Sequence, residues 1–126
     1  MAFYVEDGTI YLTKGDDAVL EVSSIVTDDG SAYELQNGDV LTLTVRMLPS
    51  TESAVLIEID SSPGSARIVF GHDDTAVLDV GRYSADVQLT TADGKRYTVW
   101  PHITGSSRYT IKNLNNFVIM PEVTAK

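Results

Sequence analysis

The sequence of 126 residues contains no cysteine, which excludes disulfide bonds, thiolate zinc sites and cysteine nucleophiles together. The fold must therefore be held by core packing. Basic residues are also scarce, because nine Lys and Arg stand against eighteen Asp and Glu, for a formal net charge of −9. Such a surface repels phosphate backbones and anionic lipid, so we expect neither nucleic acid nor a membrane as a partner.

Long hydrophobic runs are missing as well. No apolar run approaches the roughly 18–20 residues of a membrane span, and segment 1–7 lacks the basic start of a signal peptide. We therefore expect a soluble protein that is not exported by a signal peptide. Hydrophobic residues make up 43% of a chain whose length suits one domain. The prediction is a single domain over residues 1–126.

Apolar and polar residues alternate along most of the chain, which is the pattern of strands with one buried face. The clearest case is Val40–Leu48, where Leu41, Leu43, Val45 and Met47 share one face. Further strands are predicted over 19–27, 55–60, 66–70, 83–90, 97–99 and 109–112, followed by an apolar run over 117–120. A chain of this kind forms about eight strands around one core.

Turn residues separate these segments. Asp93-Gly94 lies between two alternating runs, which is a strong hairpin signal because glycine adopts positive φ without strain. Other turns are predicted at Lys14-Gly15-Asp16, Asp28-Asp29-Gly30-Ser31, Asn37-Gly38-Asp39 and Pro63-Gly64. The one short helix is predicted over His72–Leu78, with Asp side chains capping its first turn.

One motif indicates the architecture. Asp79, Gly81, Tyr83 and Ala85 follow the D-x-G-x-Y-x-small pattern that opens the sixth strand of immunoglobulin-like sandwiches, where the Tyr hydroxyl binds backbone a few residues upstream. Ala85 stands where antibody domains have a cysteine. The alternative is that Tyr83 is simply a half-buried strand aromatic. We predict an all-β fold, an immunoglobulin-like antiparallel β-sandwich of about seven to nine strands.

Paired acids in the predicted turns suggest calcium as one possible ligand. The pairs are Asp16-Asp17, Asp28-Asp29 and Asp73-Asp74. Loops at one end of a sandwich can bring such oxygens together around calcium. However, no pair fits the spacing of an EF-hand loop, and Asp is also a common turn and cap residue. We favour solvated turns and predict no metal site.

Catalytic signals are weak. His72 and His102 lie thirty residues apart, so they do not form a zinc-binding pair, and any Ser-His-Asp triad would have to use one of them. The sequence also lacks a nucleophile elbow and a glycine-rich phosphate loop. We therefore predict no catalytic residue, no cofactor and no enzyme activity, and keep a small enzyme as a remote alternative.

Aromatic side chains suggest a second alternative, a carbohydrate-binding or adhesive module. Tyr97, Trp100 and Tyr109 are candidates for stacking on sugar rings. Trp100 alternates out of phase with Tyr97 and Val99, which predicts that it lies on the outer face of its strand. The competing interpretation, which we favour, is that Trp100 packs at a sheet edge beside Pro101.

Five segments in order support a resemblance to a known family: Ile10–Ala18, Val26–Leu35, Gly38–Arg46, the Gly81–Tyr83 corner and Asn116–Thr124. The chain resembles the immunoglobulin-like domains of tailed-phage and prophage structural proteins. The likeness is greatest to the N-terminal domain of siphophage baseplate upper proteins and to tail-fibre attachment domains. In those longer proteins a linker and further domains follow, whereas this sequence ends at Lys126, so we expect a stand-alone adaptor, a fragment, or a shared sandwich fold alone.

The resemblance implies a non-enzymatic virion part that docks onto a tail or baseplate hub, present in the virion or in the host cytoplasm during assembly. Its partners would be other virion proteins or further copies of the chain. The docking surface would be an exposed edge strand or an apolar patch. The candidate interaction residues are Phe3, Tyr4, Trp100, Phe117 and Met120.

Overall fold

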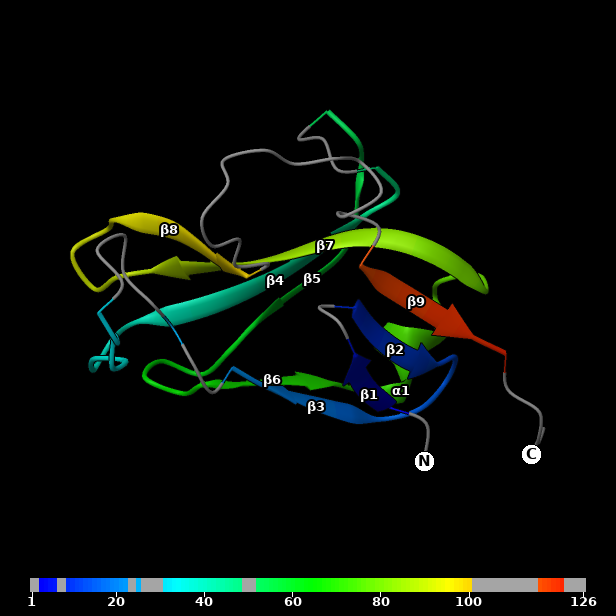
Figure 1. Ribbon diagram of the computed structural model, residues 1–126, viewed down its shortest axis with the longest axis horizontal. Helices are drawn as coiled ribbons and strands as arrows, with labels where there is room; N and C mark the ends of the chain where they lie inside the picture. The colour runs from blue at the N-terminus through cyan, green and yellow to red at the C-terminus, as the bar shows by residue number, and fades with distance from the viewer. Residues whose placement is uncertain are drawn as a thin grey trace.

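The computed structural model describes residues 3–6, 9–22, 25, 31–48, 52–100 and 116–121 (Figure 1). These residues form nine strands and one short helix. In chain order they are β1 (Phe3–Glu6), β2 (Thr9–Thr13), β3 (Ala18–Glu21), β4 (Val40–Arg46), β5 (Val55–Asp60), β6 (Arg67–Phe70), α1 (His72–Ala76), β7 (Gly81–Thr90), β8 (Arg96–Trp100) and β9 (Phe117–Met120).

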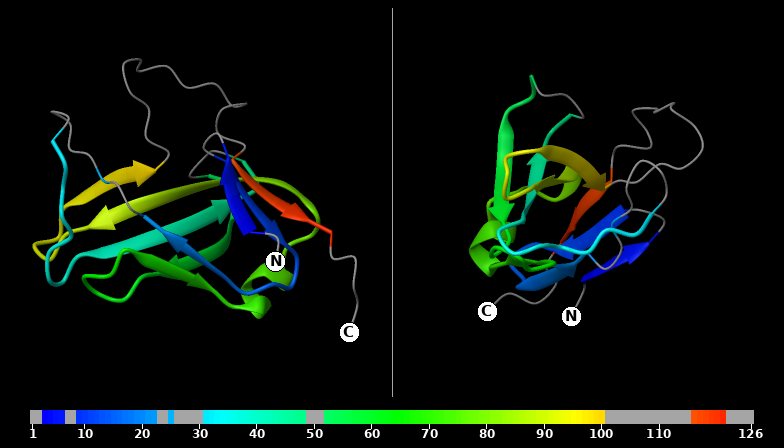
Figure 2. Two further views of the ribbon diagram at one scale, coloured as in Figure 1. Left: turned by 60° about the horizontal axis from the view of Figure 1, so that its bottom comes forward. Right: turned by 90° about the vertical axis from the view of Figure 1, so that its left-hand side faces the viewer.

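The strands form two layers. A seven-stranded sheet has the order β1-β2-β9-β7-β4-β5, with β8 also paired to β7, and a two-stranded sheet consists of β3 and β6. The small sheet lies against one face of the large one, as the two views in Figure 2 show. The predicted all-β sandwich is therefore confirmed. The strand predicted over 109–112 lies outside the described residues.

One strand pair departs from the antiparallel prediction. β2 and β9 run parallel, from Ile10 opposite Phe117 to Thr13 opposite Met120, so the large sheet is mixed. All other pairs formed by the described residues are antiparallel. The parallel pair joins strands from the two ends of the chain, and strands that no hairpin connects are free to run in the same direction.

The core follows the alternation in the sequence. On β4, Leu41, Leu43 and Val45 have no exposed surface, and the intervening residues are half-buried. On β7 the buried apolar residues are Tyr83, Ala85, Val87 and Leu89, as predicted. Phe70 of the small sheet and Phe117 of the large one pack with their ring centroids 6.1 Å apart. Aromatic contact thus joins the two layers at the centre of the core.

The predicted turns and helix are present where the structure describes them. Gly38 has φ +93° and Gly94 has φ +92°, conformations that favour glycine. At α1, the Asp74 carboxylate accepts a hydrogen bond from the backbone N–H of Gly71 at 2.7 Å. The buried hydroxyl of Thr75 donates to the Asp16 carbonyl oxygen at 2.9 Å. The helix is therefore fixed to the turn between β2 and β3.

Three different partners pair along one edge of β7. Residues 81–83 pair with β9, and residues 87–90 pair with β8. Between these two ladders, the side chain of Asn116 pairs with the backbone of Ala85. The backbone carbonyl oxygen of Asn116 also accepts from Ile10 N at 2.8 Å. Asn116 therefore connects β7, through its side chain, to β2, through its backbone.

Candidate functional site

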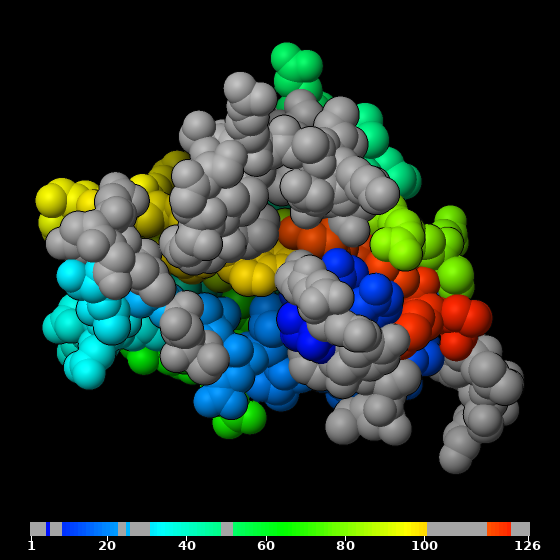
Figure 3. All heavy atoms as spheres, viewed as in Figure 1, coloured from blue at the N-terminus to red at the C-terminus, as the bar shows by residue number. Residues whose placement is uncertain are grey.

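A cleft of about 820 Å³ lies between the segment 31–39 and the hairpin that joins β7 to β8. Both walls reach the surface at the same end of the molecule, where they are coloured cyan and yellow in Figure 3. Ile25, Leu89 and Val99 form an apolar floor. The volume is within the range of about 300–1,000 Å³ that is usual for small-molecule sites.

Asp39 holds the two walls together. Its carboxylate is almost fully buried and accepts hydrogen bonds from the Tyr33 hydroxyl at 2.5 Å and the Gln36 backbone N–H at 2.8 Å. It also accepts from the backbone N–H of Ala92, in the hairpin, at 3.3 Å. A buried carboxylate with three donors is well satisfied. The segment 33–39 is thereby fixed to the β7–β8 hairpin.

The Tyr33–Asp39 pair has altered acid–base properties. The hydrogen bond to Asp39, with burial and the negative charge of Asp39 adding to it, raises the pKa of Tyr33 to about 12. The hydrogen bond from Tyr33, together with the one from Gln36, holds the pKa of Asp39 below its usual value. A hydrogen bond that requires protonated tyrosine and ionised aspartate favours both of these forms. The pair stays in one protonation state across the neutral range.

The hairpin supplies the polar rim. Thr91 N donates to the Lys95 carbonyl oxygen at 2.8 Å, and the Thr91 hydroxyl donates to the Asp93 carboxylate. The latter hydrogen bond lowers the pKa of Asp93. The Asp93 and Lys95 side chains are both about two-thirds exposed, and their charged atoms lie 4.0 Å apart. The two rim charges therefore offset each other at the opening of the cleft.

The two aromatic residues of β8 lie differently. Tyr97, one of the candidates for stacking on sugar, is 47% exposed and lines the cleft. Trp100 is half-buried and packs against the core, in agreement with the favoured packing interpretation and not with display on the outer face. It stands opposite Val87, after a register shift between Val87 and Gln88. Such a bulge adds one residue and moves the following side chain to the other face.

The predicted corner has the expected contact. The Tyr83 hydroxyl donates to the backbone carbonyl oxygen of Asp79 at 2.7 Å, and its ring is buried. Burial, with the nearby Asp79 charge adding to it, raises the pKa of Tyr83. Gly81 begins β7 opposite Ile119, and the Asp79 carboxylate is exposed 4.0 Å from Lys14 Nζ. These residues stabilise the start of β7 and lie apart from the cleft.

The predicted terminal patch is wrong at Phe117. This side chain has no exposed surface, because alternation along β9 turns it into the core beside Phe70. Met120 is half-buried. Phe3 and Tyr4 belong to β1, but their side chains lie outside the described residues.

Two of the acid pairs and one histidine meet at α1. His72 Nδ1 lies 3.1 Å from the exposed Asp17 carboxylate, and His72 Nε2 lies 3.7 Å from Asp73. Within the described ranges, no group of three or more His, Cys, Asp or Glu is arranged to hold a metal ion. His102, Tyr109 and the pair Asp28-Asp29 lie outside the described residues.

An apolar surface that the alternation mispredicts lies at the other end of β4. Met47, predicted to share the buried face of Val40–Leu48, is 53% exposed, and Val55 is 45% exposed. Leu48 and Leu56 are exposed beside them. The ladder between β4 and β5 shifts register at Val45/Arg46, so Leu56 is an extra residue on β5 and Val55 stands opposite Arg46. Met47 follows the last residue of β4. We call Met47, Leu48, Val55 and Leu56 the hairpin-end patch.

Sequence reasoning also missed Asp39 and Asn116. The sequence places Asp39 in a turn and Asn116 at the start of the segment Asn116–Thr124, but the partners Ala92 and Ala85, to which their side chains connect, lie 53 and 31 residues away. Comparison with protein-family models, curated proteins and solved structures finds no match to this chain. Among the described helices, none has the length and apolar character to cross a membrane.

Proposed function

We propose that this β-sandwich is a non-enzymatic assembly module that docks onto a protein partner through β5 and the hairpin-end patch. The observation that carries the proposal is the exposure of four large apolar side chains at one end of the β4–β5 pair. Among the described residues β5 pairs only with β4, so its outer edge presents backbone donors and acceptors. An open edge beside exposed apolar residues is suited to adding a strand from a partner.

This surface can both bind a partner strand and fix its alignment along β5. Backbone hydrogen bonds along β5 would align the partner strand, and alternate side chains would set its specificity. Val55 stands opposite Arg46, and Leu56 is the extra residue at the register shift, so exposed apolar side chains lie at the start of the edge strand. A partner that adds a strand to β5 and also covers this end of it would bury both the backbone groups of the edge and these side chains.

We place this module in a phage or prophage virion, as part of a tail or baseplate. The support is the order of the five segments from Ile10–Ala18 to Asn116–Thr124, which resembles domains of such particles. Partners would be the neighbouring tail or baseplate proteins or further copies of this chain, in closed cyclic symmetry where the copies associate.

The test is binding to the products of neighbouring genes. Purified chain is immobilised, and each neighbouring tail or baseplate protein is passed over it, while light scattering gives its mass in solution. Leu56→Lys places a charge on the edge strand and should abolish partner binding or self-association. Val77→Lys is the matched control, because Val77 is 68% exposed just after α1 and belongs neither to β5 nor to the hairpin-end patch.

Binding that Leu56→Lys removes and Val77→Lys keeps supports the proposal. Equal binding by the two variants would exclude β5 as the docking edge. A gene neighbourhood without tail, portal or baseplate genes would overturn the virion assignment.

A further inference from the structure

The cleft beside Tyr33 and Tyr97 has the features of a ligand site that the docking surface does not use. We propose that it binds a neutral sugar unit, such as the end of a glycan chain. The proposal rests on three properties of the cleft: an apolar floor with an exposed aromatic wall, a hydroxyl- and amide-rich lining with balanced charge, and walls fixed before any ligand arrives.

The floor and wall match the apolar side of a sugar ring. Leu89 and Ile25 are buried at the base of the cleft, and Val99 is half-buried beside them. Tyr97 stands at the wall with nearly half of its surface exposed. The C–H groups on one face of a pyranose carry slight positive charge, and they pack favourably on the negative face of an aromatic ring. A ring stacked on Tyr97 would also cover the apolar floor.

The polar lining suits hydroxyl groups. Thr98, Ser31 and Gln36 line the cleft and carry hydroxyl and amide groups, and Gln36 Nε2 donates to the Glu34 carbonyl oxygen at 2.8 Å. Hydroxyls and side-chain amides both donate and accept hydrogen bonds, as the hydroxyl groups of a sugar do. These side chains can rotate to donate or to accept, so they can form hydrogen bonds with a ligand whose hydroxyl groups also do both.

The charges of the cleft favour a neutral ligand. Asp39 is buried and engaged by three donors, so it is not offered to a ligand. Asp93 and Lys95 offset each other at 4.0 Å. An anionic ligand would also meet the field of a chain with net charge −9. A cationic ligand would meet only one exposed carboxylate among the described lining residues, that of Asp93, and Lys95 lies beside it.

The walls are positioned in advance. The carboxylate of Asp39 connects the Tyr33 side of the cleft to Ala92 in the hairpin. The hairpin is itself closed by the pairing of Thr91 with Lys95 and the turn at Gly94. A ligand that enters preformed walls loses less free energy to ordering the protein.

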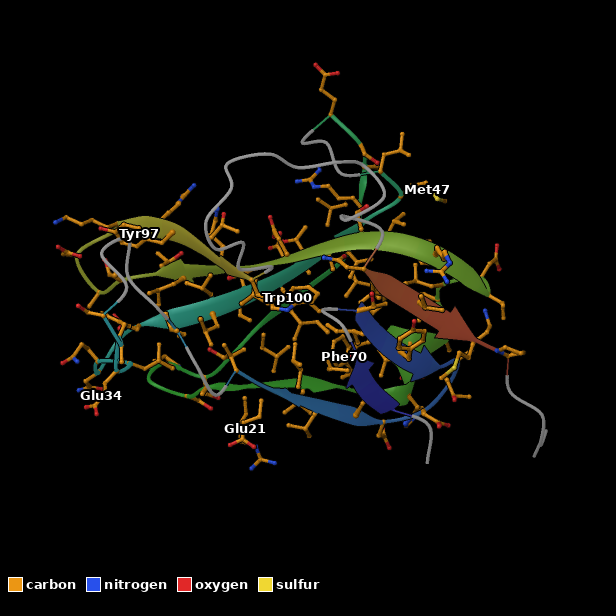
Figure 4. The ribbon with its side chains drawn as sticks, in the orientation of Figure 1. Glu21, Glu34, Met47, Phe70, Tyr97 and Trp100 are labelled. Carbon is orange, nitrogen blue, oxygen red and sulfur yellow. The ribbon has the colours of Figure 1, made fainter. Side chains whose placement is uncertain are left out.

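The cleft and the hairpin-end patch are separate. In Figure 4 the labelled Tyr97 and Met47 lie toward opposite ends of the molecule. Tyr97 pairs with Leu89 near the end of β7, whereas the patch follows Arg46, which pairs with Ser84 near the start of β7. The two surfaces can therefore be tested independently.

The experiment is a binding screen with the full chain. The probes are neutral oligosaccharides of glucose, galactose, mannose, N-acetylglucosamine and N-acetylgalactosamine, with sialylated glycans and a lysine-containing peptide as comparisons. Binding is followed by amide shifts in a nitrogen-15 spectrum and by calorimetry. We expect a neutral glycan to shift the amides of Leu89, Ala92, Tyr97 and Thr98 at millimolar concentration.

Two variants of Tyr97 make the test specific. Tyr97→Ala removes the stacking face and should weaken binding about tenfold or more, the usual scale for truncating a central aromatic. Tyr97→Phe keeps the ring and should bind within a factor of about three, since it loses only one exposed hydroxyl group. Leu56→Lys should leave sugar binding unchanged, and Tyr97→Ala should leave partner binding unchanged. Failure of one function therefore does not imply failure of the other.

Three results would overturn the proposal. The first is that no neutral glycan shifts the cleft amides. The second is that binding survives Tyr97→Ala unchanged. The third is a preference for sialylated glycans or for the lysine peptide, which would assign the cleft to a charged ligand instead.

Discussion

The side-chain amide of Asn116 pairs with both backbone groups of Ala85, as a neighbouring strand would. Ala85 N donates to Asn116 Oδ1 at 2.8 Å, and Asn116 Nδ2 donates to the Ala85 carbonyl oxygen at 3.0 Å. All of these groups are buried. The amide thus fills the gap between β9 and β8 on one edge of β7.

Replacing Asn116 should therefore destabilise the fold. Asn116→Ala leaves the N–H and C=O of Ala85 buried without partners, each at a cost of about 1–3 kcal/mol. The measurement is the free energy of unfolding in denaturant. The control is Asn37→Ala at an exposed turn position, which should change stability by less than about 0.5 kcal/mol. Equal stability of the two variants would mean that the amide contributes nothing to the sheet.

The hydroxyl group of Tyr83 gives a second stability test. Tyr83→Phe removes the donor to the Asp79 carbonyl oxygen while keeping the buried ring. We expect a loss of about 1–3 kcal/mol, because an acceptor at the corner loses its partner. Tyr97→Phe, at an exposed ring, is the control for loss of a hydroxyl group. An unchanged denaturation midpoint for Tyr83→Phe would contradict a stabilising corner.

The contact between Thr75 and Asp16 fixes α1 to the rest of the fold. Thr75→Val keeps the shape of the side chain but removes the hydroxyl group that donates to the Asp16 carbonyl oxygen. We expect a loss of about 1–2 kcal/mol in unfolding free energy. Thr98→Val, at an exposed strand position, should have little effect. If both variants are equally stable, the helix is held by apolar packing alone.

The Tyr33–Asp39 pair predicts how stability depends on pH. The pKa of Tyr33 is raised from 10.0 to about 12, so its contribution is complete below about pH 10 and is lost as the pH rises through about 12. The pKa of Asp39 is lowered from 3.8, so its contribution is present above that value and is lost as the pH falls through the lower folded-state pKa.

Unfolding free energy measured across pH tests this prediction. Asp39→Asn should reduce the loss of stability that the pair causes at both high and low pH. An ultraviolet titration of this variant should show the pKa of Tyr33 returning toward 10.0. Subtraction of the Tyr33→Phe titration identifies which tyrosine responds. The difference between the two titrations is the titration of Tyr33. If this difference shows an ordinary tyrosine pKa, the Tyr33–Asp39 pair is not formed in solution.

The alternation of apolar and polar residues was sufficient to predict most of the strands. The alternation over β4 and over β7 predicted which side chains enter the core, because a strand with one buried face repeats every two residues. The glycines at 38 and 94 predicted turns for an equally local reason. Alternation alone failed at Met47, which follows the last residue of β4 and is 53% exposed. It also gave the wrong face for Trp100, which packs against the core as the favoured interpretation expects. A register shift lies just before Trp100 in the ladder, and a bulge depends on the partner strand as well as on the strand's own sequence.

The sequence by itself determined the all-β class, the position of the short helix and the corner tyrosine. These features follow from periodicity, turn chemistry and one motif, all of which act over a few residues. Only the tertiary structure decided that β2 and β9 run parallel, that Asn116 joins β7, and that Asp39 connects the walls of the cleft. Each of these contacts spans thirty or more residues, because the polar groups involved find partners only after the layers have packed.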